Sequence, residues 1–332
     1  MARIGLIDVD GHNFPNIPLM KLSAWHKKQG DSAEWYDPLF HSIGEPFDRV
    51  YKSKVFSFTP DFQYGINAHE VINGGTGYAI RLVDGAEIYD KTLDPDLPPE
   101  IEHIYPDYSL YPQLTKDWAY GFLTRGCPRG CTFCHVSKKE QKKSYKVADL
   151  DEFWRGQKNI MLCDPNILGC PQHLELLQQV VDSKAKVEFN QGLDVRLITE
   201  KNLELIKQIP MKYIHLAYDR IQDKDIIEPK LKSFKDATGY NYKKVMVYIL
   251  VNYESTLSED LYRIYFCRDL ELDPFVMIYD KAHCDPIYKK LQRWCNNDFI
   301  FWSCPTFEEF LNDTHSKKKT ERSEDLSTKL FC

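Results

Sequence analysis

The segment from which this chain can first be interpreted is Arg125-Gly126-Cys127-Pro128-Arg129-Gly130-Cys131-Thr132-Phe133-Cys134. Its three cysteines stand four and three residues apart, in a run rich in glycine, proline and arginine. The residues before it, Trp118 to Thr124, are apolar, aromatic and β-branched, which is typical of a strand. We therefore expect the cysteines in a loop beyond the carboxyl end of a strand, where α/β folds keep their chemistry.

Three cysteines in one short loop indicate a metal or cluster site. Thiolate is the soft ligand that holds zinc ions and iron–sulfur clusters in proteins. The order Cys-x-x-x-Cys-x-x-Cys, with Phe133 before the last cysteine, closely resembles the signature of the radical S-adenosylmethionine (SAM) superfamily. The resemblance implies that Cys127, Cys131 and Cys134 hold a 4Fe-4S cluster and leave one iron open to bind SAM.

Other interpretations of the same cysteines stay open. Structural zinc would need a fourth ligand, and His135 follows Cys134 directly, but neighbouring positions chelate one metal poorly and zinc sites usually combine two separated pairs. The run from Cys131 to His135 also matches the pattern for c-type haem attachment, which normally accompanies export. A disulfide framework is disfavoured, because the chain is large and lacks secretory features.

The composition is that of an ordinary globular protein, and it restricts the partners. Of 332 residues, 43% are hydrophobic and 28% are charged, and the formal net charge is -6. This negative balance argues against a large non-specific nucleic-acid surface. The apolar run in Met1–Asp10 is too short for a signal peptide, and no run of about eighteen apolar residues predicts a membrane span. We expect a cytoplasmic protein.

The remaining cysteines show no ligand spacing. We expect most of them to be reduced and buried as small hydrophobic side chains. They are Cys163, Cys170, Cys267, Cys284, Cys295, Cys304 and Cys332. The first 126 residues contain no cysteine, whereas the methylthiotransferases among radical SAM enzymes carry three further cluster cysteines in their N-terminal domain. Sulfur insertion is therefore disfavoured for this chain.

Residues 1–94 alternate strand and helix patterns. Arg3–Val9 is a short apolar strand, Leu19–Gln29 has apolar residues at helical spacing, and Ser53–Thr59 is a second strand. Val71-Ile72 then runs into a glycine-rich turn. This pattern predicts a small doubly wound, Rossmann-like α/β domain.

Two further regions follow along the chain. Residues 95–115 are crowded with prolines, which predicts a stiff linker and a domain boundary. Residues 116–285 repeat a strand and a helix, which predicts a parallel sheet curving into a six-stranded partial βα barrel, in agreement with the radical SAM fold. The expected strands are Trp118–Thr124, Asn159–Cys163, Lys186–Asn190, Tyr213–Ala217, Val245–Val251 and Pro274–Tyr279. The expected helices are Val147–Trp154, Gln172–Asp182, Glu200–Gln208, Asp223–Thr238 and Glu259–Leu270.

Part of the N-terminal region resembles the cobalamin-binding domain of one radical SAM subgroup. That domain shows Asp-x-His-x-x-Gly after its first strand, Ser-x-Leu after a middle strand and Gly-Gly after a later one. The corresponding residues here are Asp10-Gly11-His12-Asn13-Phe14-Pro15, Ser57-Phe58-Thr59 and Gly74-Gly75. Pro15 and Thr59 depart from the pattern. The domain therefore either binds cobalamin or is a degenerate form that shapes the substrate pocket.

Polar residues follow the expected strands and would surround the mouth of the barrel. Acids and amides suit the amine and ribose hydroxyls of SAM, and an arginine can bind a carboxylate with two hydrogen bonds. Carried over from the family by position, the SAM-contacting residues are Phe133 through its backbone, Asp164, Asn166, Gln191, Asp194 and Arg196. The other interpretation of each side chain is a helix cap or an ion pair between loops.

Residues 286–332 are first aromatic and then charged. Trp294, Phe301 and Phe307 belong to an aromatic run that predicts a helix and turn covering the barrel by packing. The lysines Lys317-Lys318-Lys319 and the polar residues around them predict a mobile tail.

The resemblance implies a radical reaction. SAM would be cleaved reductively to a 5′-deoxyadenosyl radical that abstracts hydrogen from a substrate, with the electron from a flavodoxin or ferredoxin-type donor. Cobalamin-dependent methyl transfer is the main alternative, and rearrangement or oxidation without a second cofactor is another. A non-enzymatic zinc or nucleic-acid-binding module is the alternative from a different class. The sequence identifies neither the substrate nor a catalytic side chain.

Overall fold

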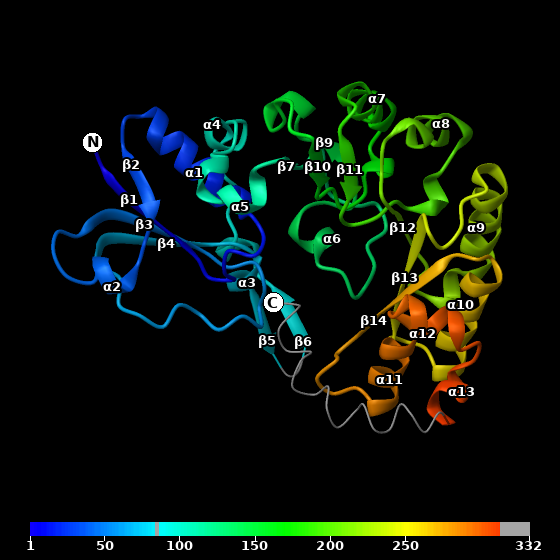
Figure 1. The fold of residues 1–332 in the computed structure, drawn as a ribbon. Coiled ribbons are helices and arrows are strands. Elements are labelled where there is room, and N and C mark those ends of the chain that lie inside the picture. Colours follow the sequence, from blue (N-terminus) through cyan, green and yellow to red (C-terminus); the bar gives the residue numbers. More distant parts are fainter. Residues whose placement is uncertain (84–85, 313–332) are drawn as a thin grey trace. The chain divides into compact units, whose positions relative to one another are not determined.

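The computed structural model describes residues 1–83 and 86–312 (Figure 1). It is a mixed α/β structure with mostly parallel sheets, and no closed barrel is found within these residues. The chain forms two compact units, Met1–Cys163 and Asp164–Cys332, which are described separately below. No helix in the described part is long and apolar enough to cross a membrane.

The first unit begins with a four-stranded parallel sheet. Its strands are β1 (Arg3–Asp8), β2 (Ser32–Trp35), β3 (Phe47–Ser53) and β4 (Ala68–Gly74), in the order β2-β1-β3-β4. The chain leaves β1 to form β2 on one side and then crosses back to form β3 on the other. The carboxyl ends of β1 and β3 therefore lie at the point where the strand order reverses, which is where open parallel sheets keep their ligand crevices.

The two faces of this sheet are packed differently. On one face Ile4 and Leu6 pack against Leu19 and Met20 of α1 (Ile17–Lys28), whose Asn16 cap accepts a hydrogen bond from the Leu19 amide at 3.2 Å. The opposite face is a smaller cluster of buried side chains, Ile7, Tyr36, Phe47 and Val50. Burying each large apolar side chain stabilises the fold by about 1.5–3 kcal/mol before entropy is counted.

The expected strand Ser53–Thr59 is wrong in position. Strand β3 ends at Ser53, because the Asp10 carboxylate accepts hydrogen bonds from the amides of Val55 and Phe56 and from Thr59 Oγ1 and so bends the chain. Strand β2 and the antiparallel hairpin of β5 (Ile80–Val83) and β6 (Ala86–Tyr89) are not predicted by the sequence pattern. Short helices α2 (Pro38–His41) and α3 (Thr76–Ala79) complete this part.

Residues 95–115 pack with the first unit. Helix α4 (Pro99–Glu102) and helix α5 (Pro112–Thr115) each begin with proline, which suits the first helical turn. Ile101, Leu110 and Tyr111 from this segment are buried against α1 and β1. The short 3-10 turns beside these helices are η1 (Lys91–Leu93) and η2 (Tyr108–Leu110).

All six strands expected in the second half of the sequence are formed. In the first unit β7 (Trp118–Gly121) pairs in parallel with β10 (Asn159–Leu162). The expected strand to Thr124 is interrupted after Gly121, where a Cβ atom would collide with the ring of Phe153, and the chain resumes as β8 (Thr124–Arg125). Strand β8 pairs antiparallel with β9 (Tyr145–Lys146), and α6 (Val136–Lys139) lies between them in sequence.

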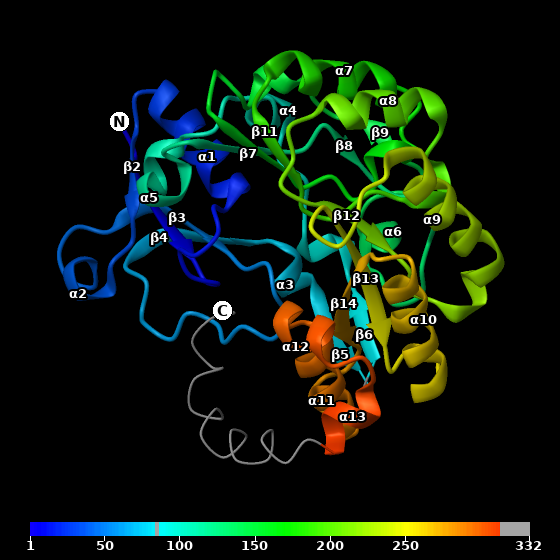
Figure 2. The ribbon, with the colours of Figure 1, turned by 45° about the vertical axis from the view of Figure 1, so that its right-hand side comes forward.

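In the second unit the strands are β11 (Lys186–Phe189), β12 (Ile214–Ala217), β13 (Val245–Val251) and β14 (Asp273–Ile278), and β12-β13-β14 form a parallel sheet. Helices α7 (His173–Ser183), α8 (Glu200–Gln208), α9 (Lys224–Thr238) and α10 (Leu257–Asp269) occupy the expected stretches. Helices α9 and α10 lie along one side of this sheet (Figure 2). The remaining 3-10 turns are η3 (Leu150–Glu152), η4 (Ile167–Gly169), η5 (Val195–Leu197) and η6 (Ile221–Asp223).

The expected helix Val147–Trp154 is wrong. Only η3, Leu150–Glu152, is helical there. Residues Val147 and Ala148 instead donate their amides to the carbonyl of Leu123, which keeps this stretch extended beside β8.

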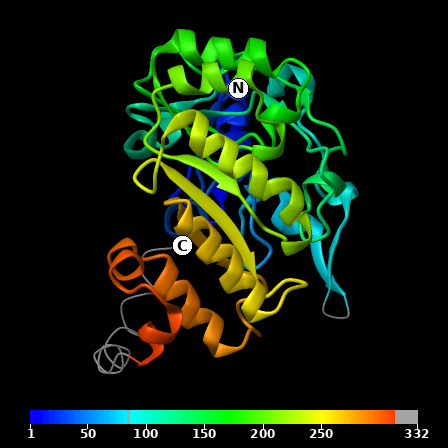
Figure 3. The ribbon, with the colours of Figure 1, turned by 90° about the vertical axis from the view of Figure 1, so that its right-hand side faces the viewer.

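The second unit ends in three helices that gather together (orange to red in Figure 3): α11 (Pro286–Cys295), α12 (Asp298–Ser303) and α13 (Phe307–Asn312). Trp294 is fully buried, with ring centroids 4.9 Å from Phe301 and 5.6 Å from Phe307. This confirms that the aromatic run packs, although Phe299 is 83% exposed. Lys317-Lys318-Lys319 and the expected tail lie outside the described residues.

Most of the scattered cysteines are buried, as expected. Cys267 and Cys295 lie in the interior of the second unit, where burial raises the pKa of both thiols and keeps them protonated. Cys163, Cys170 and Cys284 are also buried, and Cys304 is partly exposed. Cys332 lies outside the described residues.

Candidate functional site

The cysteine loop is closed at its base by backbone contacts. The Cys127 amide donates to the carbonyl of Gln141 at 3.1 Å, so the entry and exit of the loop run side by side. Gly126 has φ +76°, and a Cβ atom there would collide with the carbonyl oxygen of Lys143. Glycine is therefore required at position 126, both for its left-handed backbone and for this close approach.

A single carboxylate fixes the start of the loop. Glu140 accepts a hydrogen bond from the Gly126 amide and forms an ion pair with Arg125 Nη1 at 3.2 Å. The Arg125 guanidinium also lies 3.4 Å from the centroid of the Phe122 ring, a cation–π contact. Arg125 and Gly126 thus leave β8 in a fixed direction.

The three thiols share this loop. Cys127, Cys131 and Cys134 are each partly exposed, and the Cys134 amide donates to the carbonyl of Cys131 at 3.1 Å in a tight turn. Within the described residues, no group of three or more His, Cys, Asp and Glu side chains is arranged to hold a metal ion. The three expected ligands therefore lie on one loop.

The residues of the cysteine loop nevertheless have the chemistry to bind a soft, negatively charged group. Residues 125–143 contain six arginines and lysines and a single acid, Glu140, and this positive surrounding suits thiolates and sulfides. In the described structure the buried Nδ1 atom of His135, next to Cys134, has no hydrogen-bond partner. Three thiols, local positive charge and an unsatisfied imidazole nitrogen together make this loop the candidate cluster site.

In the second unit, three of the expected SAM-contacting residues are brought together. Asn166 Nδ2 lies 3.2 Å from Asp194 Oδ2, and Asp194 Oδ1 accepts from Arg196 Nε at 2.7 Å. A second acid, Asp223, accepts from Arg196 Nη1 at 3.4 Å. The network lies after the carboxyl ends of strands, as the position of these residues in the sequence predicts.

The other expected residues are placed as follows. Asp164 is buried, at 3% exposure, at the start of the second unit, and Gln191 is exposed after β11. Phe133 is partly exposed in the cysteine loop of the first unit. Part of the alternative interpretation also holds, since Asn166 accepts from the Gly169 amide at the start of η4 and Asp194 accepts from the Arg196 amide at the start of η5.

Buried charges that the sequence pattern does not predict organise these strand ends. Arg263 on α10 is 0% exposed, forms an ion pair with Asp260, and donates to the carbonyls of Tyr218 at 2.9 Å, Leu250 at 2.8 Å and Asp219. It therefore holds the ends of β12 and β13 together. Nothing in the spacing of α10 distinguishes this arginine from a surface residue, because three of its partners are backbone carbonyls and Asp260 is an ordinary i, i+3 neighbour.

Asp219, two residues after the end of β12, is a perturbed acid at these strand ends. Burial raises its pKa to about 6, against the nearby positive charge of Arg263. In the described residues its Oδ1 atom is enclosed and has no hydrogen-bond partner. A carboxyl group that titrates close to neutral pH and has an unsatisfied oxygen is a functional-site candidate.

The residues that resemble a cobalamin motif have structural partners in the first unit. The Asp10 carboxylate caps the turn after β3. The His12 ring packs 4.3 Å from Trp35 and 5.6 Å from Tyr111, and burial lowers its pKa. Gly75 has φ +97°, and the space for a Cβ atom is occupied by the backbone of Lys54.

Two comparisons with known proteins gave no match: no family model matches the chain, and no curated protein matches it either. The cysteine loop and the strand-end network are therefore the features that bear on the function.

Proposed function

We propose that this protein is a radical SAM enzyme. Cys127, Cys131 and Cys134 hold a 4Fe-4S cluster, and SAM binds beside it. The observation that carries the proposal is a loop with three thiols and a net positive charge, which follows the parallel strand β7 and the short strand β8 and is closed by Gly126 and Glu140. Thiolates of this number and spacing suit a four-iron cluster with one open iron.

The chain's own residues bind and orient the cofactors. When bound, the cluster supplies the electron that cleaves SAM to methionine and a 5′-deoxyadenosyl radical. Asn166, Asp194 and Arg196 contact the ribose and carboxylate of SAM, since the amide and acid match hydroxyl and amine groups and the guanidinium matches a carboxylate. Arg196, which is held by Asp194 and Asp223, keeps a fixed orientation for this contact. Asp164 and Gln191 complete the set, with the backbone of Phe133 at the adenine.

The fold required by this function is a six-stranded partial barrel behind a Rossmann-like domain. Six strands that alternate with helices, and parallel pairing in both units, support it. The order β2-β1-β3-β4 is also the start of a flavodoxin-like doubly wound sheet. The protein acts in the cytoplasm, where a flavodoxin or ferredoxin-type protein donates the electron.

A cobalamin-dependent methyltransferase is the second candidate. The reversal of strand order between β1 and β3 favours it, because a ligand crevice is expected there. The packing of His12 against Trp35 and the occupied space at Gly75 favour instead a degenerate domain. Titration of the purified protein with cobalamin, followed by absorbance, separates the two.

Anaerobic reconstitution tests the proposal. Protein loaded with iron and sulfide should become brown, and dithionite with SAM should yield 5′-deoxyadenosine. The Cys131→Ala variant should produce none, and Cys304→Ala, outside the loop, should behave like the unchanged protein. Colourless protein that binds stoichiometric zinc would instead indicate a non-enzymatic zinc or nucleic-acid-binding module.

A further inference from the structure

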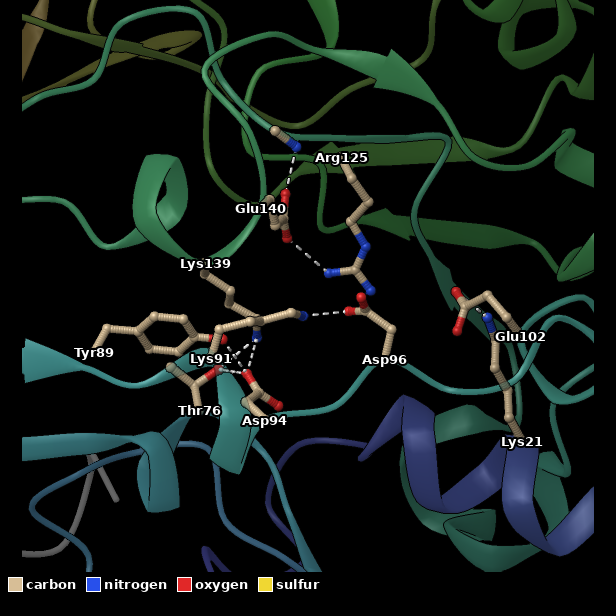
Figure 4. Close-up of polar contacts among 11 residues, drawn as sticks. Lys21, Thr76, Tyr89, Lys91, Asp94, Asp96, Glu102, Arg125, Lys139 and Glu140 are labelled. Atoms are coloured by element: carbon tan, nitrogen blue, oxygen red, sulfur yellow. Dashed lines mark hydrogen bonds and ion pairs between the residues drawn. The ribbon is translucent and has the colours of Figure 1, made fainter.

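The cysteine loop has a second set of contacts, with the segment from Thr76 to Asp94 in the same unit (Figure 4). Lys139, the last residue of α6, donates from Nζ to Thr76 Oγ1 at 2.5 Å and pairs with Asp94 Oδ2 at 3.3 Å. His135 Nε2 lies 2.8 Å from Glu87 Oε2 on β6. His135, directly after Cys134, therefore contacts β6, and Lys139, at the end of α6, contacts residues on either side of the β5–β6 hairpin.

Asp94 is the centre of these contacts. It is 8% exposed, and the same Oδ2 atom accepts from Tyr89 Oη at 3.0 Å and from Thr76 Oγ1 at 3.4 Å. A buried carboxylate with two neutral donors and one lysine is costly to leave unpaired, so Lys139 is held firmly once α6 is docked. Figure 4 shows Tyr89, Thr76 and Lys139 converging on Asp94.

Two adjacent residues, Lys139 at the end of α6 and Glu140 directly after it, connect the two ends of the cysteine loop. Lys139 binds the Thr76–Asp94 segment, while Glu140 binds the Gly126 amide and Arg125 at the beginning of the loop (Figure 4). Because Lys139 and Glu140 are neighbours in sequence, the contact that fixes Lys139 also fixes Glu140, which holds the residues before Cys127. The loop is therefore held by a residue outside it, Asp94, and by a residue of its own, Glu140.

We propose that Asp94 and Glu140 are positioning residues that hold the cysteine loop in its closed form, and that the segment after Gly75 is its docking platform. This proposal rests on the proposed function only where it concerns the cluster. It gives the Gly74-Gly75-Thr76 run a different role from a cofactor-tail site, since Gly75 packs on Lys54 and Thr76 binds Lys139.

The first test uses the cluster-free protein. Iodoacetamide alkylation, read by mass spectrometry, should be several-fold faster at Cys127, Cys131 and Cys134 in Asp94→Asn and in Glu140→Gln than in the unchanged protein. Cys304, in the other unit, serves as the reference thiol and should keep its rate in both variants. The matched control is Asp96→Asn, because the Asp96 side chain is 85% exposed and its ion pair within the described residues is with Lys91 on the surface.

A second variant guards against a folding defect at Asp94. Lys139→Met removes the partner from the partly exposed side of the pair and should accelerate alkylation as Asp94→Asn does. The double variant should be no faster than either single variant, because both remove the same contact. Equal rates in Asp94→Asn and Asp96→Asn, or additive effects in the double variant, would overturn the proposal.

A third measurement concerns the loaded protein. After anaerobic reconstitution, chelator should strip iron from Asp94→Asn several-fold faster than from Asp96→Asn, with a broadened electron paramagnetic resonance signal in the reduced form. If the unchanged protein takes up no iron, the proposed function fails while the alkylation test still decides on the platform. If it takes up iron and the two variants lose it equally fast, the platform fails and the function stands.

Discussion

At the scale of single residues, buried charges are the main feature that the sequence patterns do not predict. Arg263 satisfies three strand-end carbonyls and Asp260 from a fully buried position. A buried ion pair of this kind adds little net stability when intact, but removing one partner leaves a charge without compensation. We therefore expect the loss of Arg263 to lower the stability of the fold.

We expect Arg263→Met to destabilise the protein by about 3–5 kcal/mol, because Asp260 and the carbonyls of Tyr218 and Leu250 lose their donor inside the fold. Urea unfolding followed by circular dichroism measures the change. The control is Lys207→Met, whose side chain is 36% exposed and pairs with Glu204 on the surface. A loss no larger than that of the control would contradict the assigned role.

Asp8 gives the first unit a pH dependence. Burial raises its pKa from 3.8 to about 6, despite the hydrogen bond that Tyr111 donates to it at 2.7 Å. Between these two values the folded state binds more protons than the unfolded chain, so this group's contribution to stability is lost as the pH rises. Asp8→Asn should therefore be more stable than the unchanged protein at pH 7, by about 2 kcal/mol, and equally stable near pH 3.

Urea unfolding curves at several pH values measure this difference. The exposed Asp96→Asn variant is the control and should keep the pH profile of the unchanged protein. An Asp8→Asn profile parallel to the unchanged one from pH 3 to pH 7 would show that Asp8 is not the group responsible.

At the scale of elements, hydrophobic periodicity predicted most of the chain, because buried strands and amphipathic helices carry their burial pattern in the sequence. Strand β13 and helix α8 have the expected bounds. Periodicity failed where tertiary contacts decide the conformation. Strand β2 is short and polar and is stabilised by pairing with β1, and the chain after β3 is turned by Asp10, a residue distant in sequence.

The glycine pair after β4 offers an element-scale test. Gly75→Ala should cost about 1–3 kcal/mol, because φ is +97° and a Cβ atom would collide with the Lys54 backbone. Gly74→Ala is the matched neighbour, since a Cβ atom there meets no atom of the described structure within 4 Å. Thermal unfolding of both variants, read by circular dichroism, compares them directly. Similar losses at the two positions would contradict the assignment of Gly75 to packing.

In the candidate site too, the sequence pattern predicts some features, whereas others depend on tertiary contacts. The rule that carboxyl ends of parallel strands meet at one edge correctly grouped Asn166, Asp194 and Arg196. The same rule says nothing about which acid is left with an unsatisfied oxygen. Asp219 acquires that property only from burial beside Arg263, which comes from a helix later in the chain.

At the scale of the whole molecule, the chain forms two compact units, and we expect each to unfold with its own stability. Hydrogen exchange in increasing urea, read by mass spectrometry, should therefore show peptides from 1–163 and from 164–312 losing protection at different midpoints. Arg263→Met should lower the midpoint of the second group by more than that of the first. Coincident midpoints in both proteins would indicate a single cooperative unit.

The closed base of the cysteine loop has a practical consequence for protein engineering. Because Gly126 and Lys143 meet at the backbone and β8 pairs with β9 just outside them, the intervening residues behave as a cassette. We expect a replacement segment between these two anchors to leave the register of the flanking strands unchanged if it keeps Lys139 and Glu140, which hold the loop at Asp94 and at the Gly126 amide. We therefore expect the scaffold to accept transplanted metal-binding loops that also keep Gly126 at their start.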